Sequence, residues 1–276
     1  MTPVAYAEMA PYLRNDGKSM ENKKTSFLYK IIKGLVRLIY PKTDMAGTEH
    51  LPKEASIIVG NHAQMNGPIV SELYIPGRHY TWCAGEMMEL SEVPDYAYTD
   101  FWSGKPKGIR WFYRLLSYLI APLSVCIFNN ANTIPVYHDT RVVTTFRTSI
   151  KALTEGDSIV IFPEHAVGYN NILCGFQDKF IELARMYYRK TGKELSFVPV
   201  YIAPALRTAY FGEPVRYRAE ADRNEERKRI CGELMDSITA LAAGLPPHRV
   251  VPYLNISKKD YPMNTPVEAV KHEKAV

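Results

Sequence analysis

Short apolar runs bounded by turn-forming residues alternate along the chain with segments whose apolar positions recur at helical spacing. The runs predict buried strands, and they lie at Ser56–Gly60, His79–Ala84, Thr133–Tyr137, Ser158–Phe162 and Phe197–Ala203. The helical spacing predicts helices at Thr25–Tyr40, Ile109–Phe128, Thr140–Gly156, Phe176–Gly192 and Asp222–Gly244. This alternation predicts an α/β fold, in which helices flank a central mixed, largely parallel sheet.

The helix predicted at Thr25–Tyr40 is strongly amphipathic. Its apolar face holds Phe27, Leu28, Ile31, Ile32, Leu35, Leu38 and Ile39, and the opposite face holds Lys23, Lys30, Lys33 and Arg37. An interfacial helix that lies on a membrane has this construction. A helix packed on its own domain with a solvated basic face has the same pattern, so the pattern alone leaves both interpretations open.

The segment Ile109–Phe128 is apolar nearly all round, which favours a buried helix over one that dips into a membrane. The charge-free stretch Leu115–Tyr137 is interrupted by Pro122 and by Asn129. It is therefore shorter than the ~20 apolar residues of a spanning helix, and we expect no transmembrane segment. Residues 1–19 lack the apolar core of a secretory signal.

No shift in composition marks a domain boundary. We expect a single α/β domain at residues 45–250, preceded by an amphipathic, membrane-contacting region at 1–44 and followed by an irregular tail at 251–276. Of the 276 residues, 46% are apolar and 23% charged, which excludes a disordered chain or a coiled-coil rod. The four cysteines form no CxxC pair, so neither a disulfide scaffold nor a zinc site is predicted.

The net charge of +5 is concentrated in one segment. Residues 18–42 contain seven basic side chains and one acid, a local charge of +6, so the other 251 residues sum to −1. A general basic surface for nucleic acid is therefore not expected. At about 1 kcal/mol per basic residue near an anionic leaflet, the segment predicts a membrane anchor.

Three loops that follow predicted strands carry side chains capable of chemistry. The loop Asn61–Pro68 contains His62, a candidate general base that local backbone hydrogen bonds could equally satisfy. In the loop Pro163–Gly168, Glu164 lies beside His165, a pair suited to acid–base chemistry or to capping a helix. The third loop has His138 and Arg141 near a helix start, a suitable place for an anion.

The order of five blocks resembles the glycerolipid acyltransferase family, which includes the 1-acylglycerol-3-phosphate acyltransferases. The blocks are Gly47–Pro52, Ile57–His62, Ile134–Val136, Ile161–Glu164 and Phe197–Val200, and the resemblance spans roughly 47–212. It implies transfer of a fatty acyl group from acyl-CoA or acyl carrier protein to a hydroxyl of a lysophospholipid or related lipid acceptor. It further implies a peripheral, monotopic enzyme on the cytoplasmic face of the membrane.

The resemblance implies that His62 removes the proton of the acceptor hydroxyl, while the thioester is a co-substrate and neither a metal nor a resident cofactor is needed. Glu164 is expected to support the site, with Asn66 as a further catalytic side chain. The residues expected to bind substrate are Asn61, Gln64, His138, Arg141, Pro163 and His165.

The chain departs from the family pattern at all three motifs. Gly67 stands where the family has the aspartate that pairs with its histidine, so Asn66, Glu164 or Glu72 would have to replace that partner. His138 stands for an arginine of the second motif, and 165–167 read His-Ala-Val instead of Gly-Thr-Arg. These changes favour an acceptor other than lysophosphatidic acid.

Two alternatives stay open at this stage. A relative that kept the fold but lost the His-Asp pair would bind lipid or acyl chains without catalysis. A metal or hydrolytic site would instead use His62, His138, Glu164 and His165, although no HExxH spacing supports it.

Overall fold

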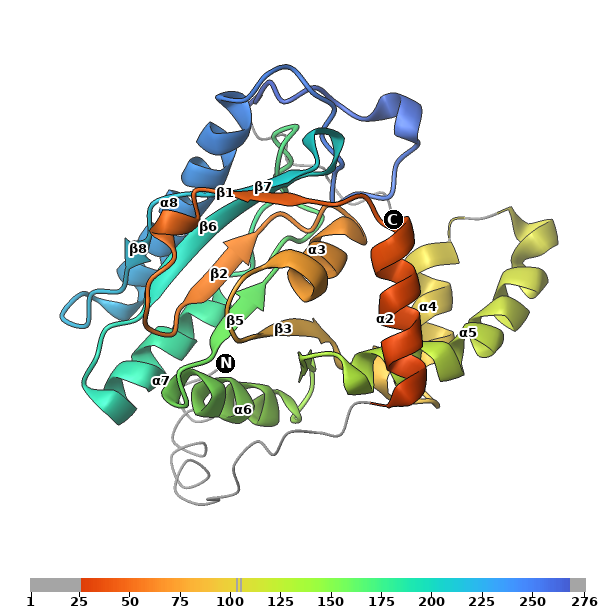
Figure 1. Ribbon diagram of the computed structural model, residues 1–276, viewed down its shortest axis with the longest axis horizontal. Helices are drawn as coiled ribbons and strands as arrows, with labels where there is room; N and C mark the ends of the chain where they lie inside the picture. The colour runs from red at the N-terminus through yellow and green to blue at the C-terminus, as the bar shows by residue number, and fades with distance from the viewer. Residues whose placement is uncertain (1–25, 103, 105, 269–276) are drawn as a thin grey trace. The chain divides into compact units, whose positions relative to one another are not determined.

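A computed structural model describes residues 26–102, 104 and 106–268 of the chain (Figure 1). Its contacts form two compact units, each built from two stretches of sequence. Among the described residues, unit 1 comprises those within 26–32 and 83–152, and unit 2 comprises those within 33–82 and 153–268. The divisions expected after residues 44 and 250 stay predictions, and residues 1–25 and 269–276 of those outer regions lie outside the described residues.

Unit 2 holds most of the sheet. Its strands are β1 Asp44–Ala46, β2 Ile57–Gly60, β5 Ser158–Ile161, β6 Ser196–Ala203, β7 Thr208–Phe211, β8 Val215–Arg216 and most of β3, His79–Ala84. They lie in the order β1-β7-β6-β2-β5-β3, and β8 pairs with β6. The pairs β1–β7, β2–β6, β2–β5 and β3–β5 are parallel, whereas β7 and β8 run antiparallel to β6. The prediction of an α/β fold with a mixed, largely parallel sheet is confirmed.

The centre of this sheet explains why its strands are nearly continuous apolar runs. Strand β2 lies between β5 and β6, with Ile58 opposite Val160 on one side and Val198 on the other. All four residues of β2 are buried. A parallel strand covered on both faces needs apolar residues at every position, and the run Ile57–Gly60 supplies them.

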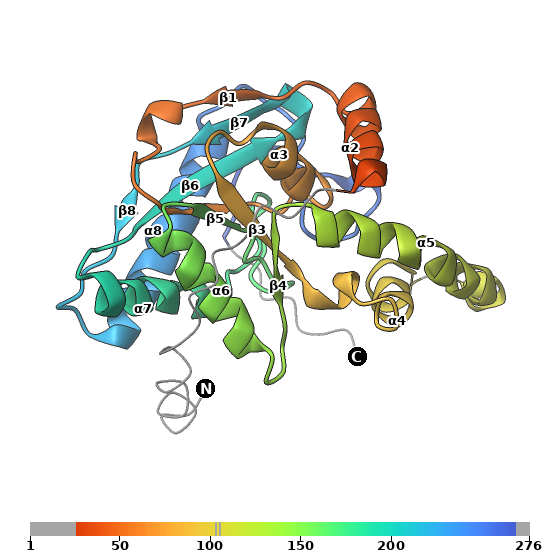
Figure 2. The same ribbon diagram turned by 60° about the horizontal axis from the view of Figure 1, so that its bottom comes forward.

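Helices cover both faces of the sheet in unit 2 (Figures 1 and 2). They are α3 Asn66–Tyr74, α7 Glu182–Thr191 and α8 Arg223–Ala243. Successive residues of a strand face opposite sides. Val198 and Val200 of β6 accordingly share a buried cluster with Val70 of α3, while the ring of Phe197 contacts Phe180 on the other side.

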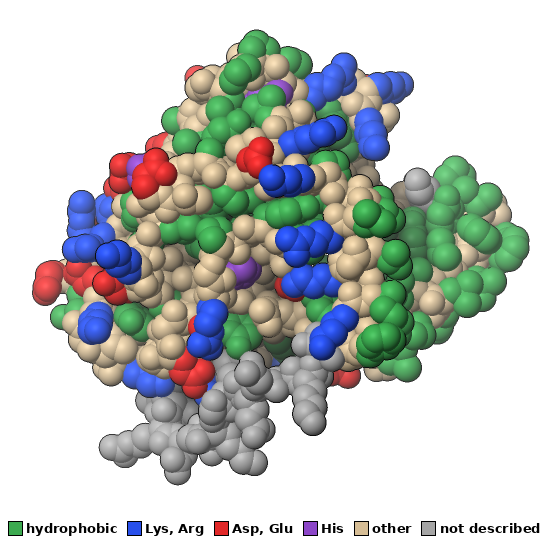
Figure 3. All heavy atoms as spheres, viewed as in Figure 1, with side chains coloured by type: hydrophobic (Ala, Val, Ile, Leu, Met, Phe, Trp, Pro, Cys, Tyr) green, Lys and Arg blue, Asp and Glu red, His purple; other side chains and the backbone are tan. Residues whose placement is uncertain are grey.

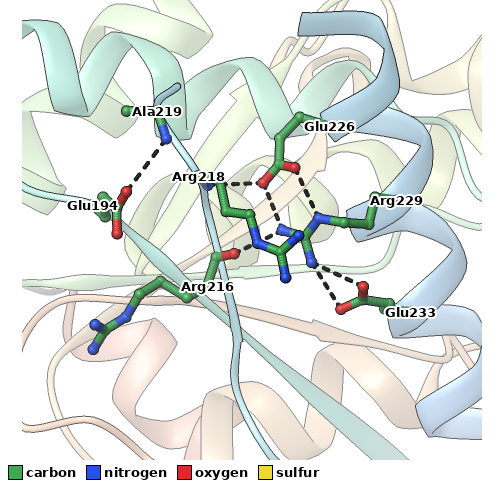
Figure 4. Close-up of polar contacts among 7 residues, drawn as sticks. All are labelled: Glu194, Arg216, Arg218, Ala219, Glu226, Arg229 and Glu233. Carbon is green, nitrogen blue, oxygen red and sulfur yellow. Dashed lines mark hydrogen bonds and ion pairs between the residues drawn. The ribbon is translucent and has the colours of Figure 1, made fainter. Parts of the chain in front are cut away.

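A buried ion pair attaches α8 to the chain that follows β8 (Figure 4). The Glu226 carboxylate accepts hydrogen bonds from the Arg229 guanidinium at 2.5 and 2.8 Å and from the backbone N–H of Arg218 at 2.8 Å. Arg229 also donates to the Arg216 carbonyl and to Glu233. These bonds lower the pKa of Glu226 even though burial alone would raise it.

Unit 1 contains short helices packed around one long helix. Its elements are η3 Gly85–Met88, α4 Val93–Ala97, η4 Tyr98–Trp102, η5 Lys107–Ile109, α5 Arg110–Asn130, β4 Thr133–Val136, most of α6, Val142–Thr154, and the start of α2, Phe27–Ile39. A small apolar cluster joins Ala121 of α5 to Met87, Val93 and Ala97. The remaining described elements are the short helices η2 Thr48–His50, η6 Lys179–Ile181, η7 Pro204–Leu206 and η8 Lys258–Asp260.

Helix α5 corrects the expectation of a buried helix broken at Pro122. The helix continues through Pro122, which only forgoes one hydrogen bond to the preceding turn. Its buried residues are Ser117, Ala121 and Ser124, whereas Trp111 and Leu119 are 69% and 68% exposed. By length and composition alone, the segment Lys107–Asn130 is apolar enough to cross a membrane. An apolar composition therefore did not mean burial here.

The amphipathic helix predicted at Thr25–Tyr40 is present as α2. Phe27, Leu38 and Ile39 are about four-fifths exposed, and Leu28, Ile31 and Leu35 are also exposed. Tyr29 is its one buried residue. A helix packed on its own domain would bury its apolar face. In the described structure most of the apolar face of α2 is exposed.

Candidate active site

The loops after β2 and β5 meet because these two strands are parallel neighbours. His62 follows β2, and Glu164 follows β5. One carboxylate oxygen of Glu164 accepts a hydrogen bond from the backbone N–H of His62 at 2.5 Å, and the other accepts from the backbone N–H of Cys174 at 2.9 Å. The structure therefore brings together the two residues that the sequence assigned to catalysis from separate motifs.

Glu164 is buried, and its environment raises the pKa to about 7. Burial disfavours the charged carboxylate, while the two backbone donors act in the opposite direction and offset only part of that effect. Both hydrogen bonds of Glu164 come from backbone N–H groups, and neither comes from the imidazole ring. We therefore assign Glu164 a positioning role: it fixes the loop that carries His62 relative to the segment around Cys174.

Two aromatic rings hold the His62 imidazole edge-on. Phe162 lies 5.6 Å away between ring centroids and Tyr253 lies 5.7 Å away, with interplanar angles of 67° and 78°. The Nδ1 atom of His62 is buried. The two rings limit the orientations that the imidazole can adopt.

The loop after His62 is tightly turned. Ala63 and Gln64 both adopt positive φ, at 45° and 55°, which non-glycine residues rarely do. Such backbone strain persists where the surroundings enforce it and often marks a functional site. The Gly67 N–H donates to the His62 carbonyl at 2.9 Å and closes the turn.

Gly67 leaves no room for the aspartate that the family places there. A Cβ atom at Gly67 would lie 2.5 Å from the His62 carbonyl oxygen and 3.0 Å from the Phe162 ring. Glycine in place of the family's aspartate therefore fits the local geometry, because the turn closes only when residue 67 has no side chain.

We expect Gly67→Ala to destabilise the protein by about 1–3 kcal/mol, because backbone atoms must move to admit the methyl group. Urea unfolding measures the change. Gly232→Ala is a matched control, since Gly232 is exposed in α8 with nothing within 4 Å of its Cβ position. That control should gain about 0.5–1 kcal/mol from helix propensity, and equal losses in both variants would contradict the interpretation of Gly67.

The replacement partners considered for His62 have other contacts. The Asn66 amide donates to the Ala63 carbonyl at 2.9 Å, and its oxygen accepts from the Tyr40 hydroxyl at 2.8 Å. Glu72 pairs with Lys33 at 2.5 Å. Asn66 therefore holds the loop to Tyr40 in the described structure, and its expected bond to the His62 ring is not among these contacts.

Asn61 and Gln64, which were expected to bind substrate, form hydrogen bonds within the protein. The Asn61 amide oxygen accepts from Ile202 N–H at 2.7 Å, and its nitrogen donates to the Ile202 carbonyl at 3.0 Å. Gln64 donates to the Leu254 carbonyl at 3.3 Å and accepts from the Tyr261 hydroxyl at 3.2 Å. These bonds suit structural roles.

The C-terminal segment 246–268 contributes to the site, which the sequence did not predict. Tyr253 contacts the His62 ring, and Leu254 and Tyr261 hold Gln64. The described part of this segment contains the short helix η8. Its sequence carries no periodicity or motif that would have indicated contact with a loop about 190 residues earlier.

Pro163 and His165 belong to a loop that is held by hydrogen bonds to the segment around Gly175 and Gln177. Pro163 is buried, and its carbonyl accepts from Gln177 N–H at 2.9 Å. His165 Nδ1 lies 2.7 Å from the Gly175 carbonyl. A carbonyl can only accept, so this nitrogen carries the proton and the ring anchors the loop.

His138 and Arg141 lie in unit 1. His138 is exposed. The Arg141 guanidinium pairs with Glu92 at 3.0 Å and with Asp139 at 2.8 Å, and it stacks over the Tyr137 ring at 4.0 Å. Two carboxylates therefore lie beside the guanidinium that was expected to attract an anion.

The metal alternative gains no support from the geometry. Within the described ranges, no three His, Cys, Asp or Glu side chains are grouped so that they could hold a metal ion.

Comparison with solved structures finds chains that are similar to this one. The chain is similar to the 1-acyl-sn-glycerophosphate (LPA) acyltransferase PlsC from Thermotoga maritima, with 16% sequence identity and a TM-score of 0.47. The similarity covers 88% of this chain and 90% of that one. No family model matches the chain, and no curated protein matches it.

Proposed function

We propose that the chain is an acyltransferase that moves a fatty acyl group from an acyl thioester to a hydroxyl of a lysophospholipid or related lipid acceptor. His62 is the general base. The thioester is acyl-CoA or acyl carrier protein and acts as co-substrate, without a resident cofactor.

The observation that carries this proposal is the junction of His62 and Glu164. The resemblance implied that these residues, 102 positions apart, serve one site, and the Glu164 carboxylate accepts the His62 backbone N–H at 2.5 Å. The junction lies at the carboxyl ends of adjacent parallel strands, where α/β sheets bind their ligands. Strained backbone at Ala63 and Gln64 accompanies it.

In the proposed step, Nε2 of His62 takes the proton of the acceptor hydroxyl as its oxygen attacks the thioester carbonyl. The C–O ester bond forms, the C–S bond breaks, and the imidazolium returns the proton to the leaving thiolate. The products are an ester and a free thiol, so no oxidant or reductant is needed. General-base catalysis of this kind contributes about 10²–10⁴-fold.

The acceptor is proposed to differ from lysophosphatidic acid. His138 replaces one arginine of the family motifs, His165 anchors its own loop, and Arg141 is paired with two carboxylates. An uncharged or differently charged headgroup places less demand on arginine side chains than a terminal phosphate does.

The acceptor is a membrane lipid, so the proposal includes peripheral attachment at the cytoplasmic face of an anionic membrane through α2. Its exposed apolar side chains include Phe27 and Leu38, and its exposed basic side chains include Lys30 and Arg37.

Reversing the charge of Lys30 and Arg37 to glutamate should weaken binding to anionic vesicles by at least about 30-fold, because each basic residue contributes about 1 kcal/mol. Lys33 is left unchanged because it pairs with Glu72. The control is the double variant Lys190→Glu/Lys228→Glu, which makes the same charge change on exposed positions of α7 and α8. Equal cosedimentation of both variants with vesicles would place the anchor elsewhere.

The function is tested by incubating the full chain and vesicles with radiolabelled acyl-CoA or acyl carrier protein and a panel of lipid acceptors. The panel includes lysophosphatidic acid, zwitterionic lysophospholipids and uncharged acyl glycerols. We expect an esterified product from at least one acceptor that lacks a terminal phosphate. If no pair gives product while the chain binds acyl thioester, the non-catalytic alternative replaces the proposal.

A further inference from the structure

Helix α5 presents a continuous apolar stripe to the outside. Six large side chains along one face are about half to two-thirds exposed, namely Trp111, Phe112, Leu115, Tyr118, Leu119 and Leu123. At 100° per residue they span about 140° of the helix surface. Hydrophobic side chains cover the part of the molecule in Figure 3 where Figure 1 shows α5. Monomeric proteins rarely leave such a patch uncovered. We call these six residues the α5 stripe.

The opposite face of α5 is packed against unit 1. Ser124 donates to the Met87 carbonyl at 2.9 Å, and Ala121 belongs to the cluster with Val93 and Ala97. Since one face is held by protein, lipid cannot surround this helix. A partner can reach the stripe only from the side, with the helix lying flat against it.

The charge around the stripe identifies that partner. Lys107, Arg110 and Arg114 lie at the start of the helix and along one edge of the stripe, and residues 107–130 include no acidic side chain. Asp95 pairs with Arg114 at 2.7 Å from outside the helix. A second copy docked by the same face would bring more basic charge and no acid on its stripe, whereas anionic headgroups bring charge of the opposite sign.

The positions of the aromatic side chains also support contact with a lipid bilayer. Trp111, Phe112 and Tyr118 are in the half of the helix that holds the basic residues, and purely aliphatic residues follow at Leu119 and Leu123. Aromatic and basic side chains together favour the headgroup region of a bilayer, while leucine favours the acyl chains.

We propose that α5 lies in the surface of an anionic bilayer, with the α5 stripe among the acyl chains and Lys107 and Arg110 at the headgroups. This contact is separate from the one proposed for α2 and does not depend on acyl transfer. The hydrogen bond from Ser26 N–H to the Asn130 side chain, 2.8 Å, ties the start of α2 to the end of α5 within unit 1. The start of α2 and the end of α5 therefore lie next to each other.

The first test measures binding of the full chain to vesicles of phosphatidylcholine and phosphatidylglycerol. The variant Leu115→Glu/Leu119→Glu should bind about 100-fold more weakly or worse, since it places two charges in the acyl region. The control Leu90→Glu/Val267→Glu introduces the same charges at exposed apolar positions that are not part of α5 and should bind like the wild type. Equal binding by both double variants would overturn the proposal.

The second test uses a variant in which the stripe stays apolar. Tryptophan fluorescence of the wild type should be quenched by vesicles that contain brominated acyl chains, and Trp111→Phe should lose most of that quenching while still binding. Quenching that persists in Trp111→Phe would overturn the proposal. Light scattering without lipid tests whether a second copy of the chain binds the stripe instead. If the wild type is a dimer and Leu115→Glu/Leu119→Glu is a monomer, the stripe binds a second copy and the proposal is overturned.

Discussion

His62→Ala should lower kcat for acyl transfer by about 10²–10⁴-fold and leave the KM for the acyl thioester nearly unchanged. His62 acts on a proton that moves in the transition state, so its loss affects the rate more than ground-state binding. We expect an effect toward the lower end of that range. The carboxylate that pairs with such a histidine can be worth about 10⁴ in turnover, and position 67, where the family places it, is glycine in a turn that admits no side chain.

Chemical rescue distinguishes a lost base from a damaged loop. Added imidazole should restore part of the rate of His62→Ala in proportion to its free-base concentration, which a purely structural defect would not allow. His50→Ala removes a histidine that pairs with Glu213 at 3.2 Å outside this site, and it should keep the wild-type kcat/KM. If His62→Ala turns over as fast as the wild type, His62 is not the base.

The central strands could be predicted because their positions in the sheet require apolar residues throughout. Ile57–Gly60 and Ser158–Ile161 have neighbours on both sides and helices over the sheet faces, so sequence and structure agree there. Strands β1 and β8 could not be predicted: they have three and two residues, too few for a pattern. They exist because distant partners pair with them, Thr208–Tyr210 for β1 and Ser196–Phe197 for β8.

The site could be predicted where motif order implied a meeting of strand ends, as for His62 and Glu164. The site could not be predicted where the sequence offers a polar side chain several possible hydrogen-bond partners. Asn66 has the right spacing to approach His62, yet it bonds to Tyr40 and Ala63 instead. Tyr253 comes from a segment without periodicity, and only the folded chain brings it to the imidazole.

Glu164 produces the second large expected effect. Glu164→Ala leaves the backbone N–H groups of His62 and Cys174 without their shared acceptor. Each donor left unsatisfied costs about 1–3 kcal/mol, so we expect the free energy of unfolding to fall by about 2–6 kcal/mol. Activity should fall with it, because the loop that carries His62 loses its link to the segment around Cys174.

The pH dependence of protein stability distinguishes Glu164 from carboxyl groups whose pKa is not raised. The pKa of Glu164 is about 7 in the folded chain and near 4.5 when exposed, so the folded state binds its proton more tightly between these values. Its contribution to stability is therefore fully present below about pH 4.5 and is lost as pH rises through 7, at about 1.4 kcal/mol per pH unit.

Urea unfolding at several pH values between 4.5 and 7 measures this slope, as the difference between the wild type and Glu164→Gln, which cannot titrate. The difference should change by about 3 kcal/mol across the window. Glu226→Gln is the matched control: Glu226 is equally buried, but its hydrogen bonds with Arg229 lower its pKa, so its contribution is lost only below this pH window and its difference from the wild type should stay flat across the window. A difference for Glu164→Gln as flat as that of the control would contradict the assignment of Glu164 as a carboxyl that burial keeps protonated toward neutral pH.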